Sequence, residues 1–282
     1  EETALNLFSI EFFRYTKELY PTWYEMVSTA RDFLLLQVKI HNGFGHSLSD
    51  ETKKTKVIFI SQITSPTAII FPIEEIIKMA KEKGILTIVD GAHVPGHIDI
   101  NIHELGCDFF TGAIHKWLCG PKGSSFLYVK KSHQNWVKPI IYSWGKNGDD
   151  PGPSEFLQDF QWQGTRDMSS FLTIPKVIDF FVEYIQPNQV HCRKIILEAF
   201  SRFKSILGTN AISPGSEWIG QMVSHPLPKN TPSDIKEILW NEHKIEIPIF
   251  EWNGDYYIRS SFQVYNEKKD LDSLMSVLGS IF

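Results

Sequence analysis

The first half of the chain alternates short apolar runs with an amphipathic segment. The runs at 56–63 (KVIFISQI), 85–90 (ILTIVD) and 107–114 (CDFFTGAI) have the length and the β-branched or aromatic content of strands. Segment 72–84 spaces its isoleucines as a helix does, with a proline at its start and a glycine at its end. Strands that are apolar throughout are buried on both faces, so this alternation predicts parallel strands in a layered α/β sheet.

The second half predicts further elements of both kinds. Segment 124–131 has the pattern of another strand, and 143–167 is dense in Gly, Pro and aromatic residues, which indicates a loop-rich stretch. Helices are expected over 169–185 and 187–207. The elements after them indicate a smaller α+β domain, with strands at 221–227, 245–254 and 256–263 and helices near 232–243 and 268–281.

These patterns divide the chain into three parts. Residues 1–34 show helical spacing and are predicted to form a helical segment that packs on the small domain. Residues 35–185 are assigned to the large domain, and residues 186–282 to the small C-terminal domain.

Composition narrows the class of protein. The 282 residues are 42% apolar and 22% charged, as in an ordinary globular protein, and a net charge of −5 argues against a nucleic-acid surface. No apolar stretch reaches the roughly 18–20 residues of a membrane span, and the acidic start does not resemble a signal peptide. We therefore expect no membrane partner. Three cysteines without C-x-x-C spacing predict neither a disulfide framework nor a metal site, and they indicate a cytoplasmic setting.

Polar residues follow two neighbouring strands of the predicted sheet. Asp90 ends the run 85–90, and the pair His115-Lys116 follows the run 107–114. Ligands of such sheets bind beyond the carboxyl ends of the strands, so these residues are expected to share one site. Taken alone, Asp90 fits a turn cap and Lys116 a peripheral charge. Together with His93 they fit a carboxylate that holds a cation and a desolvated lysine that acts as a nucleophile.

Stretch 89–129 (VDGAHVPGHIDINIHELGCDFFTGAIHKWLCGPKGSSFLYV) resembles the core of the class V aminotransferase family, which binds pyridoxal 5′-phosphate (PLP). Stretches 60–76, 160–167 and 256–266 extend the resemblance toward its isopenicillin N epimerase-like branch, a relative of the cysteine desulfurases. The resemblance implies PLP as the cofactor. It also implies the aspartate aminotransferase-like fold, a three-layer α/β/α large domain with a smaller α+β C-terminal domain.

The resemblance implies a role for each matching residue around the cofactor. Lys116 would form the Schiff base with PLP and shuttle protons at the α-carbon of an amino-acid-like substrate. Asp90 would pair with the protonated pyridine nitrogen, so that the ring acts as an electron sink. His93 would contact the phenolic oxygen or pack along the ring, and His115 would reach the phosphate. Ser65 stands near the ring, where many relatives carry an asparagine.

Three further residues are implied to meet the substrate or a second subunit. Arg259 would clamp the substrate carboxylate with its planar guanidinium, and Arg166 is a rival for this role. Thr165 would contact the phosphate bound to the neighbouring subunit, which implies a homodimer with shared active sites. Without the resemblance, Thr165 fits a turn residue and Arg259 a surface charge on a strand. Trp117 is expected in the core or in an interface.

The sequence departs from the family in two places. Ala113 stands where relatives often carry a hydroxyl or amide side chain that touches the phosphate. Relatives also carry a phosphate-cradling turn that opens a helix before the strand at 56–63, and no such turn is visible here. We expect that the sequence lacks this segment, with joins near 34–36 and 41–47.

Three classes of function stay open. The first is a PLP enzyme that acts at an α-carbon as an epimerase or a C–S lyase. The second is a cysteine desulfurase or selenocysteine lyase, which would use a cysteine shortly before the carboxylate-binding arginine; residues 240–258 contain none. The third is an inactive homologue that serves as a binding protein. The joint presence of Asp90, His93, Lys116 and Arg259 favours the first.

Overall fold

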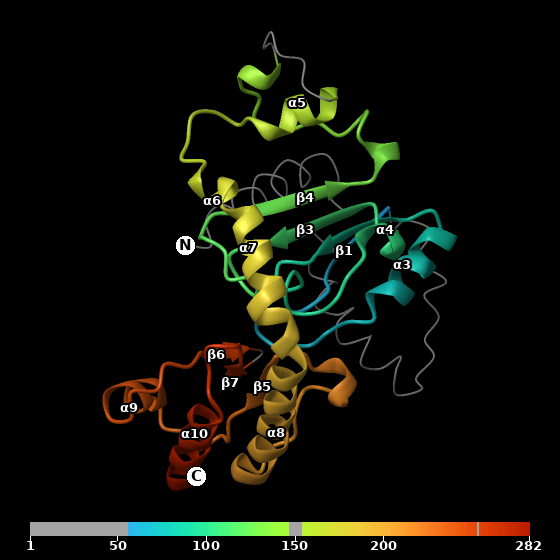
Figure 1. The fold of residues 1–282 in the computed structure, drawn as a ribbon. Coiled ribbons are helices and arrows are strands. Elements are labelled where there is room, and N and C mark those ends of the chain that lie inside the picture. Colours follow the sequence, from blue (N-terminus) through green and yellow to red (C-terminus); the bar gives the residue numbers. More distant parts are fainter. Residues whose placement is uncertain (1–55, 147–153, 253) are drawn as a thin grey trace.

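The computed structural model describes residues 56–146, 154–252 and 254–282 (Figure 1). Its large sheet has the strand order β1 (Val57–Ser61), β2 (Leu86–Asp90), β3 (Phe109–Ala113) and β4 (Ser125–Val129). Strands β1, β2 and β3 are parallel, as the apolar runs predict. Strand β4 follows β3 without a helix between them and runs antiparallel to it.

Two helical crossovers bring the carboxyl ends of the parallel strands to one edge. Helix α3 (Ile73–Glu82) connects β1 to β2 and buries its isoleucine face against the sheet. Helix α4 (Ile102–Leu105) connects β2 to β3; the Asn101 side chain caps its first turn, and Gly106 ends it with a φ of 72°. Residues Ser61, Asp90 and Thr111 lie side by side across the three strands.

The chain between β4 and α6 (Ser169–Leu172) contains two 3₁₀ turns, η1 (Lys131–His133) and η2 (Trp144–Lys146). The stretch 143–167, expected to be rich in loops, also holds the short helix α5 (Glu155–Gln161), which the sequence pattern did not predict. The Ser154 hydroxyl caps α5 by accepting the Leu157 N–H at 3.2 Å. The buried Asp159 carboxylate of α5 lies 3.5 Å from the ammonium of Lys146, which ties α5 to η2.

A nearly continuous run of helix connects the two domains, drawn in yellow and brown in Figure 1. After α6 (Ser169–Leu172) it comprises α7 (Ile174–Phe180), the π-helical η3 (Phe181–Ile185), η4 (Gln186–Asn188) and α8 (Gln189–Leu207). The helices expected over 169–185 and 187–207 are thus present, with a break at Thr173, and the boundary assigned to residue 186 falls between η3 and η4. None of the described helices is long and apolar enough to cross a membrane.

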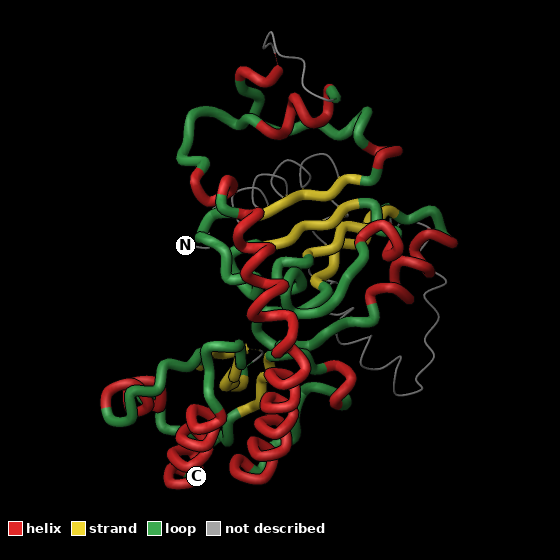
Figure 2. Tube along the Cα trace, in the orientation of Figure 1, coloured by secondary structure: helices red, strands yellow, loops and turns green. Residues whose placement is uncertain are grey.

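The small domain is an antiparallel sheet covered by helices (Figure 2). Its strand order is β5 (Met222–Pro226), β7 (Asp255–Ser261) and β6 (Ile249–Trp252). Helices α8 and α10 (Lys268–Ile281) pack together and enclose its apolar core, and η5 (Ser216–Trp218) and α9 (Ile235–Asn241) lie in its connections. The helical segment predicted for residues 1–34 and the joins predicted near 34–47 lie outside the described residues.

Hydrogen bonds tie the loops of the large sheet to the small domain. The Gln221 backbone N–H donates to His97 Nε2 at 2.6 Å, and the Gln189 amide donates to the Gly96 carbonyl at 2.9 Å. The side chain of Met222 packs in the core of the large sheet. The carboxyl ends of the parallel strands therefore lie against the small domain.

Candidate active site

The Asp90 carboxylate is held in a fixed orientation at the end of β2. The Ser61 hydroxyl donates to Oδ2 at 3.0 Å from the neighbouring strand, and the Ala92 N–H donates to Oδ1 at 2.9 Å. Both oxygens are thus oriented by residues of the large domain. A carboxylate held in this way can face a cation without having to reorganise.

Lys116 lies half-buried in the loop that follows β3. Burial lowers the pKa of its amine, the Asp90 carboxylate opposes that shift, and the Arg259 guanidinium adds to it. The Lys116 Nζ lies 3.2 Å from His93 Nε2. A lysine with a lowered pKa is the form that serves as an amine nucleophile.

His93 lies between Lys116 and the indole of Trp117. The Trp117 Nε1–H donates to His93 Nδ1 at 3.2 Å. Burial, followed by the nearby charges of Lys116 and Arg259, lowers the pKa of His93 to about 3. The imidazole is therefore neutral at any pH near 7.

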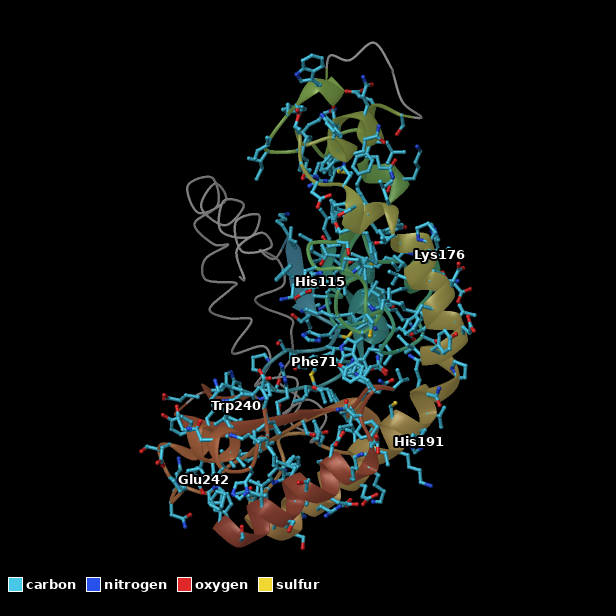
Figure 3. All side chains as sticks on the ribbon, turned by 60° about the vertical axis from the view of Figure 1, so that its left-hand side comes forward. Phe71, His115, Lys176, His191, Trp240 and Glu242 are labelled. Atoms are coloured by element: carbon cyan, nitrogen blue, oxygen red, sulfur yellow. The ribbon has the colours of Figure 1, made fainter. Side chains whose placement is uncertain are left out.

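His115 is anchored by one of its two ring nitrogens. Its Nδ1 lies 3.0 Å from the Ser124 carbonyl oxygen, which only accepts, so Nδ1 carries the proton. Figure 3 shows His115 in the middle of the molecule, at the side of the sheet. Its Nε2 is the nitrogen left for an external group, and it could donate to a phosphate only if the ring were protonated.

Arg259 reaches from β7 of the small domain to the loop after β1. One of its terminal nitrogens donates to the Ser65 carbonyl at 2.6 Å and to the Ser65 hydroxyl at 3.0 Å. The buried Nε of Arg259 has no partner among the described residues. Because a buried donor without a partner is costly, this nitrogen is a candidate donor for an acceptor that the described residues do not supply.

Thr165 and Arg166 are not brought into this cluster. Both are exposed in the loop between α5 and α6. Arg166 donates to the Gln163 side chain at 3.0 Å and lies over the Phe171 ring at 4.9 Å. Among the described residues, no hydrogen bond connects either one to Lys116, so their predicted roles stay predictions.

Sequence reasoning missed two residues that support the site. His97 bonds to the backbone of His93 and Gln221, and its ring lies 4.0 Å from that of Trp117. Gln263 donates its amide to the Trp117 carbonyl at 3.0 Å. Neither has a local signal, because His97 reads as a loop histidine and Gln263 lies far from Lys116 in the sequence.

Comparison with known proteins identifies the family. The protein-family model described as aminotransferase class V matches residues 45–274 of this chain. The chain belongs to the class V aminotransferase family. Its relatives include isopenicillin N epimerase of Streptomyces clavuligerus, 31% identical over 242 residues, which cover 81% of this chain and 61% of that protein. A probable chloroplastic L-cysteine desulfhydrase of Arabidopsis thaliana is 28% identical over 252 residues, 81% of this chain and 51% of that protein.

Solved structures confirm the predicted fold of this class V chain. An apo cysteine desulfurase from Thermococcus onnurineus NA1 superposes with a TM-score of 0.66 at 22% identity, over 84% of this chain and 63% of that one. The predicted layered α/β fold with a smaller C-terminal domain is therefore correct. The chain spans about 60% of the length of the epimerases and half that of the desulfhydrase that it matches.

The family is PLP-dependent, and the residues of this chain fit that cofactor. Asp90 offers an oriented carboxylate, Lys116 a desolvated amine and His93 a neutral ring beside it. The Arg259 Nε, which has no partner within the described part of the chain, offers a donor of the kind that a substrate carboxylate would satisfy. At the predicted phosphate end, Ala113 is buried and its side chain has no polar atom, and the His115 ring offers Nε2 alone.

Proposed function

We propose that this chain is a PLP-dependent enzyme that acts at the α-carbon of an amino acid or an amino-acid-derived substrate, as an epimerase or a C–S lyase. The contact between the Lys116 amine and the neutral His93 ring, close to Asp90 and Arg259, carries the proposal. Burial lowers the pKa of Lys116 against the opposing effect of Asp90, and the carboxylate and the Arg259 guanidinium both stay near the amine. Catalytic lysines of this kind need both properties.

Bound PLP would supply an electron sink for the negative charge that develops at the α-carbon when its proton is removed. Asp90 would hold the pyridine nitrogen in its protonated form, since its carboxylate is already oriented by Ser61 and Ala92. Lys116 would attach the cofactor through its amine and would later move the proton at the α-carbon. Arg259 would bind the substrate carboxylate, and His115 the phosphate.

Epimerisation and C–S bond cleavage share one requirement, the removal of the proton at the α-carbon. Relatives are named isopenicillin N epimerase, L-cysteine desulfhydrase and hercynylcysteine sulfoxide lyase. An epimerase would need a second proton donor on the opposite side of the α-carbon, whereas a C–S lyase would need only Lys116 and a sulfur leaving group. The proposal therefore rests on proton removal by Lys116.

Sulfur transfer is the weaker alternative, although one relative is named a probable cysteine desulfurase. A desulfurase uses a cysteine thiolate as nucleophile, and burial raises the pKa of each of the three cysteines, Cys107, Cys119 and Cys192. Cys119 also has a positive φ of 59° in the turn after Lys116, and its N–H donates to the Lys116 carbonyl. This turn orients Lys116 and is a poor location for a moving nucleophile.

We propose further that the chain forms a cytoplasmic homodimer in which Thr165 reaches the phosphate bound to its partner. The chain between β4 and α7 supports this, because it exposes large apolar side chains such as Trp144, 85% exposed, and Leu172, 77% exposed. Exposed apolar surface of this kind marks contact surfaces. The three free cysteines suit a reducing compartment.

The test is to add PLP to the protein and record its near-visible absorbance. A covalent bond to the Lys116 amine shifts the cofactor band, and borohydride reduction followed by peptide mass analysis locates the bond. Lys116→Ala should abolish both signals, whereas Lys122→Ala, an exposed lysine in the same loop, should keep them. A reduced adduct in Lys116→Ala, or none in the wild type, would refute the proposal. A panel of amino acids scored for racemisation, sulfide and pyruvate then separates epimerase from lyase.

A further inference from the structure

The indole N–H of Trp117 determines the tautomer of His93. An indole nitrogen can donate a hydrogen bond but cannot accept one. Since Trp117 Nε1 donates to His93 Nδ1 at 3.2 Å, Nδ1 must carry the lone pair, and the ring proton must lie on Nε2. This assignment comes from the hydrogen-bond network.

The Nε2–H of His93 then points at the amine of Lys116, 3.2 Å away. An ammonium group has three donors and no acceptor, so it cannot accept this proton. Only the neutral amine of Lys116 offers the lone pair that completes the contact. The Trp117 hydrogen bond therefore favours the neutral, nucleophilic form of Lys116 through His93.

A second Trp–His pair in the same chain has the same arrangement, with a carboxylate as the acceptor of the Nε2 proton. Trp136 Nε1 donates to His133 Nδ1 at 3.3 Å, and His133 Nε2 lies 2.8 Å from the Asp108 carboxylate. A carboxylate accepts, so His133 carries its proton on Nε2 as well. This pair lies away from Lys116 and serves as a matched control.

The small domain fixes the position of Trp117. The indole is buried, with 8% of the residue exposed, and lies 4.0 Å from the His97 ring. The Trp117 carbonyl accepts the amide of Gln263, which is itself buried with 3% exposed. Gln263 follows β7, the strand that carries Arg259. The position of the small domain against the large sheet therefore affects the orientation of the Trp117 indole.

We propose that Trp117 is a positioning residue that locks His93 in its Nε2–H tautomer and so keeps Lys116 as a neutral amine, with Gln263 holding Trp117 in place. The consequence for catalysis rests on the proposed function, but the tautomer lock does not. The charged and titratable groups that face His93 and Lys116 are Asp90, Arg259 and His97.

The first test reads the tautomer directly, in the full chain without PLP. Long-range proton–nitrogen spectra of protein labelled with ¹⁵N-histidine distinguish Nε2–H from Nδ1–H rings. His93 should show the Nε2–H pattern, and Trp117→Phe should convert it to a mixture or to the Nδ1–H form. Trp136→Phe should alter the His133 signal and leave that of His93 unchanged. A His93 ring with Nδ1–H in the wild type, or an unchanged ring in Trp117→Phe, would overturn the proposal.

The second test measures the amine of Lys116. Acylation by an amine-directed reagent, quantified by peptide mass analysis, should slow about fivefold at neutral pH in Trp117→Phe, and its pH midpoint should rise. The factor corresponds to the loss of one ordinary hydrogen bond. Trp136→Phe and the wild type should label equally, and equal labelling in Trp117→Phe would overturn the proposal.

Two arrangements keep the result interpretable. If Trp117→Phe does not fold, benzothienylalanine placed at position 117 keeps the ring shape and replaces the N–H by sulfur; it should give the same spectral change. A chain that shows the Nε2–H lock but never attaches PLP would refute the proposed function and leave the lock standing. The reverse result, attachment without the lock, would refute the lock alone.

Discussion

Gly91 immediately follows Asp90, and the structure predicts that a single methyl group there is destabilising. A Cβ built on Gly91 would lie 2.0, 2.3 and 2.8 Å from three ring atoms of Phe110. Phe110 is fully buried and stacks on Phe126 at 6.2 Å, so its ring has little room to move. Gly91 does not have a positive φ, so a steric clash rather than backbone strain sets the cost. Overpacking of this kind costs about 1–3 kcal/mol, and we expect Gly91→Ala in that range.

A double-mutant cycle tests the cause of this loss. Phe110→Leu removes the clashing ring atoms at a cost of its own on the order of 1–2 kcal/mol. Gly91→Ala combined with Phe110→Leu should then be about 1–2 kcal/mol more stable than the sum of the single changes predicts. Urea unfolding followed by circular dichroism measures each free energy, provided that the slope with denaturant is unchanged.

The control is Gly279, a glycine of α10 whose added Cβ would meet no atom within 4 Å. Gly279→Ala should be neutral or stabilising by up to about 1 kcal/mol, because alanine favours the helix. If Gly91→Ala unfolds within about 0.5 kcal/mol of the wild type, or if the cycle is additive, the packing argument is wrong.

Three further predictions concern pH, substrate and assembly. Burial lowers the pKa of His93 to about 3 and that of His97 to about 4 in the folded chain. Below about pH 6.5 the unfolded chain therefore binds more protons than the folded chain. The free energy of unfolding should fall with acid by up to about 1.4 kcal/mol per pH unit for each ring. Urea midpoints at pH 7 and pH 5 measure this loss, which should be smaller in His97→Gln and would be unaltered there if the ring were not the cause. Arg259→Lys should raise the KM for an amino-acid substrate roughly ten- to a hundredfold and keep the PLP absorbance, because lysine loses the fork and keeps the charge; an unchanged KM would remove Arg259 from the substrate site. Mixing inactive Lys116→Ala with Thr165→Val should restore part of the activity if subunits share sites, and no recovery in a mixture shown by light scattering to contain dimers would contradict sharing.

Several parts of the fold could be predicted from local pattern. The three parallel strands and α3 follow from apolar runs and isoleucine spacing, since burial on both faces leaves no polar alternation. Helix α5 was missed because proline, glycine and aromatic residues obscure its pattern. Its cap at Ser154 was readable, but the burial of Asp159 beside Lys146 was not.

The sequence by itself determined that Asp90 ends one strand and that Lys116 follows the neighbouring one, because parallel strands bring their carboxyl ends to one edge wherever the chain leads next. Only the tertiary structure decided what these residues meet. Arg259 reaches Ser65 across 194 positions of sequence, and Gln263 reaches Trp117 across 146. Such contacts depend on how the small domain packs against the large sheet, and no local periodicity of the sequence encodes that packing. The tautomer of His93 and the lowered pKa of Lys116 follow from it, because burial and hydrogen-bond partners are properties of the packed chain.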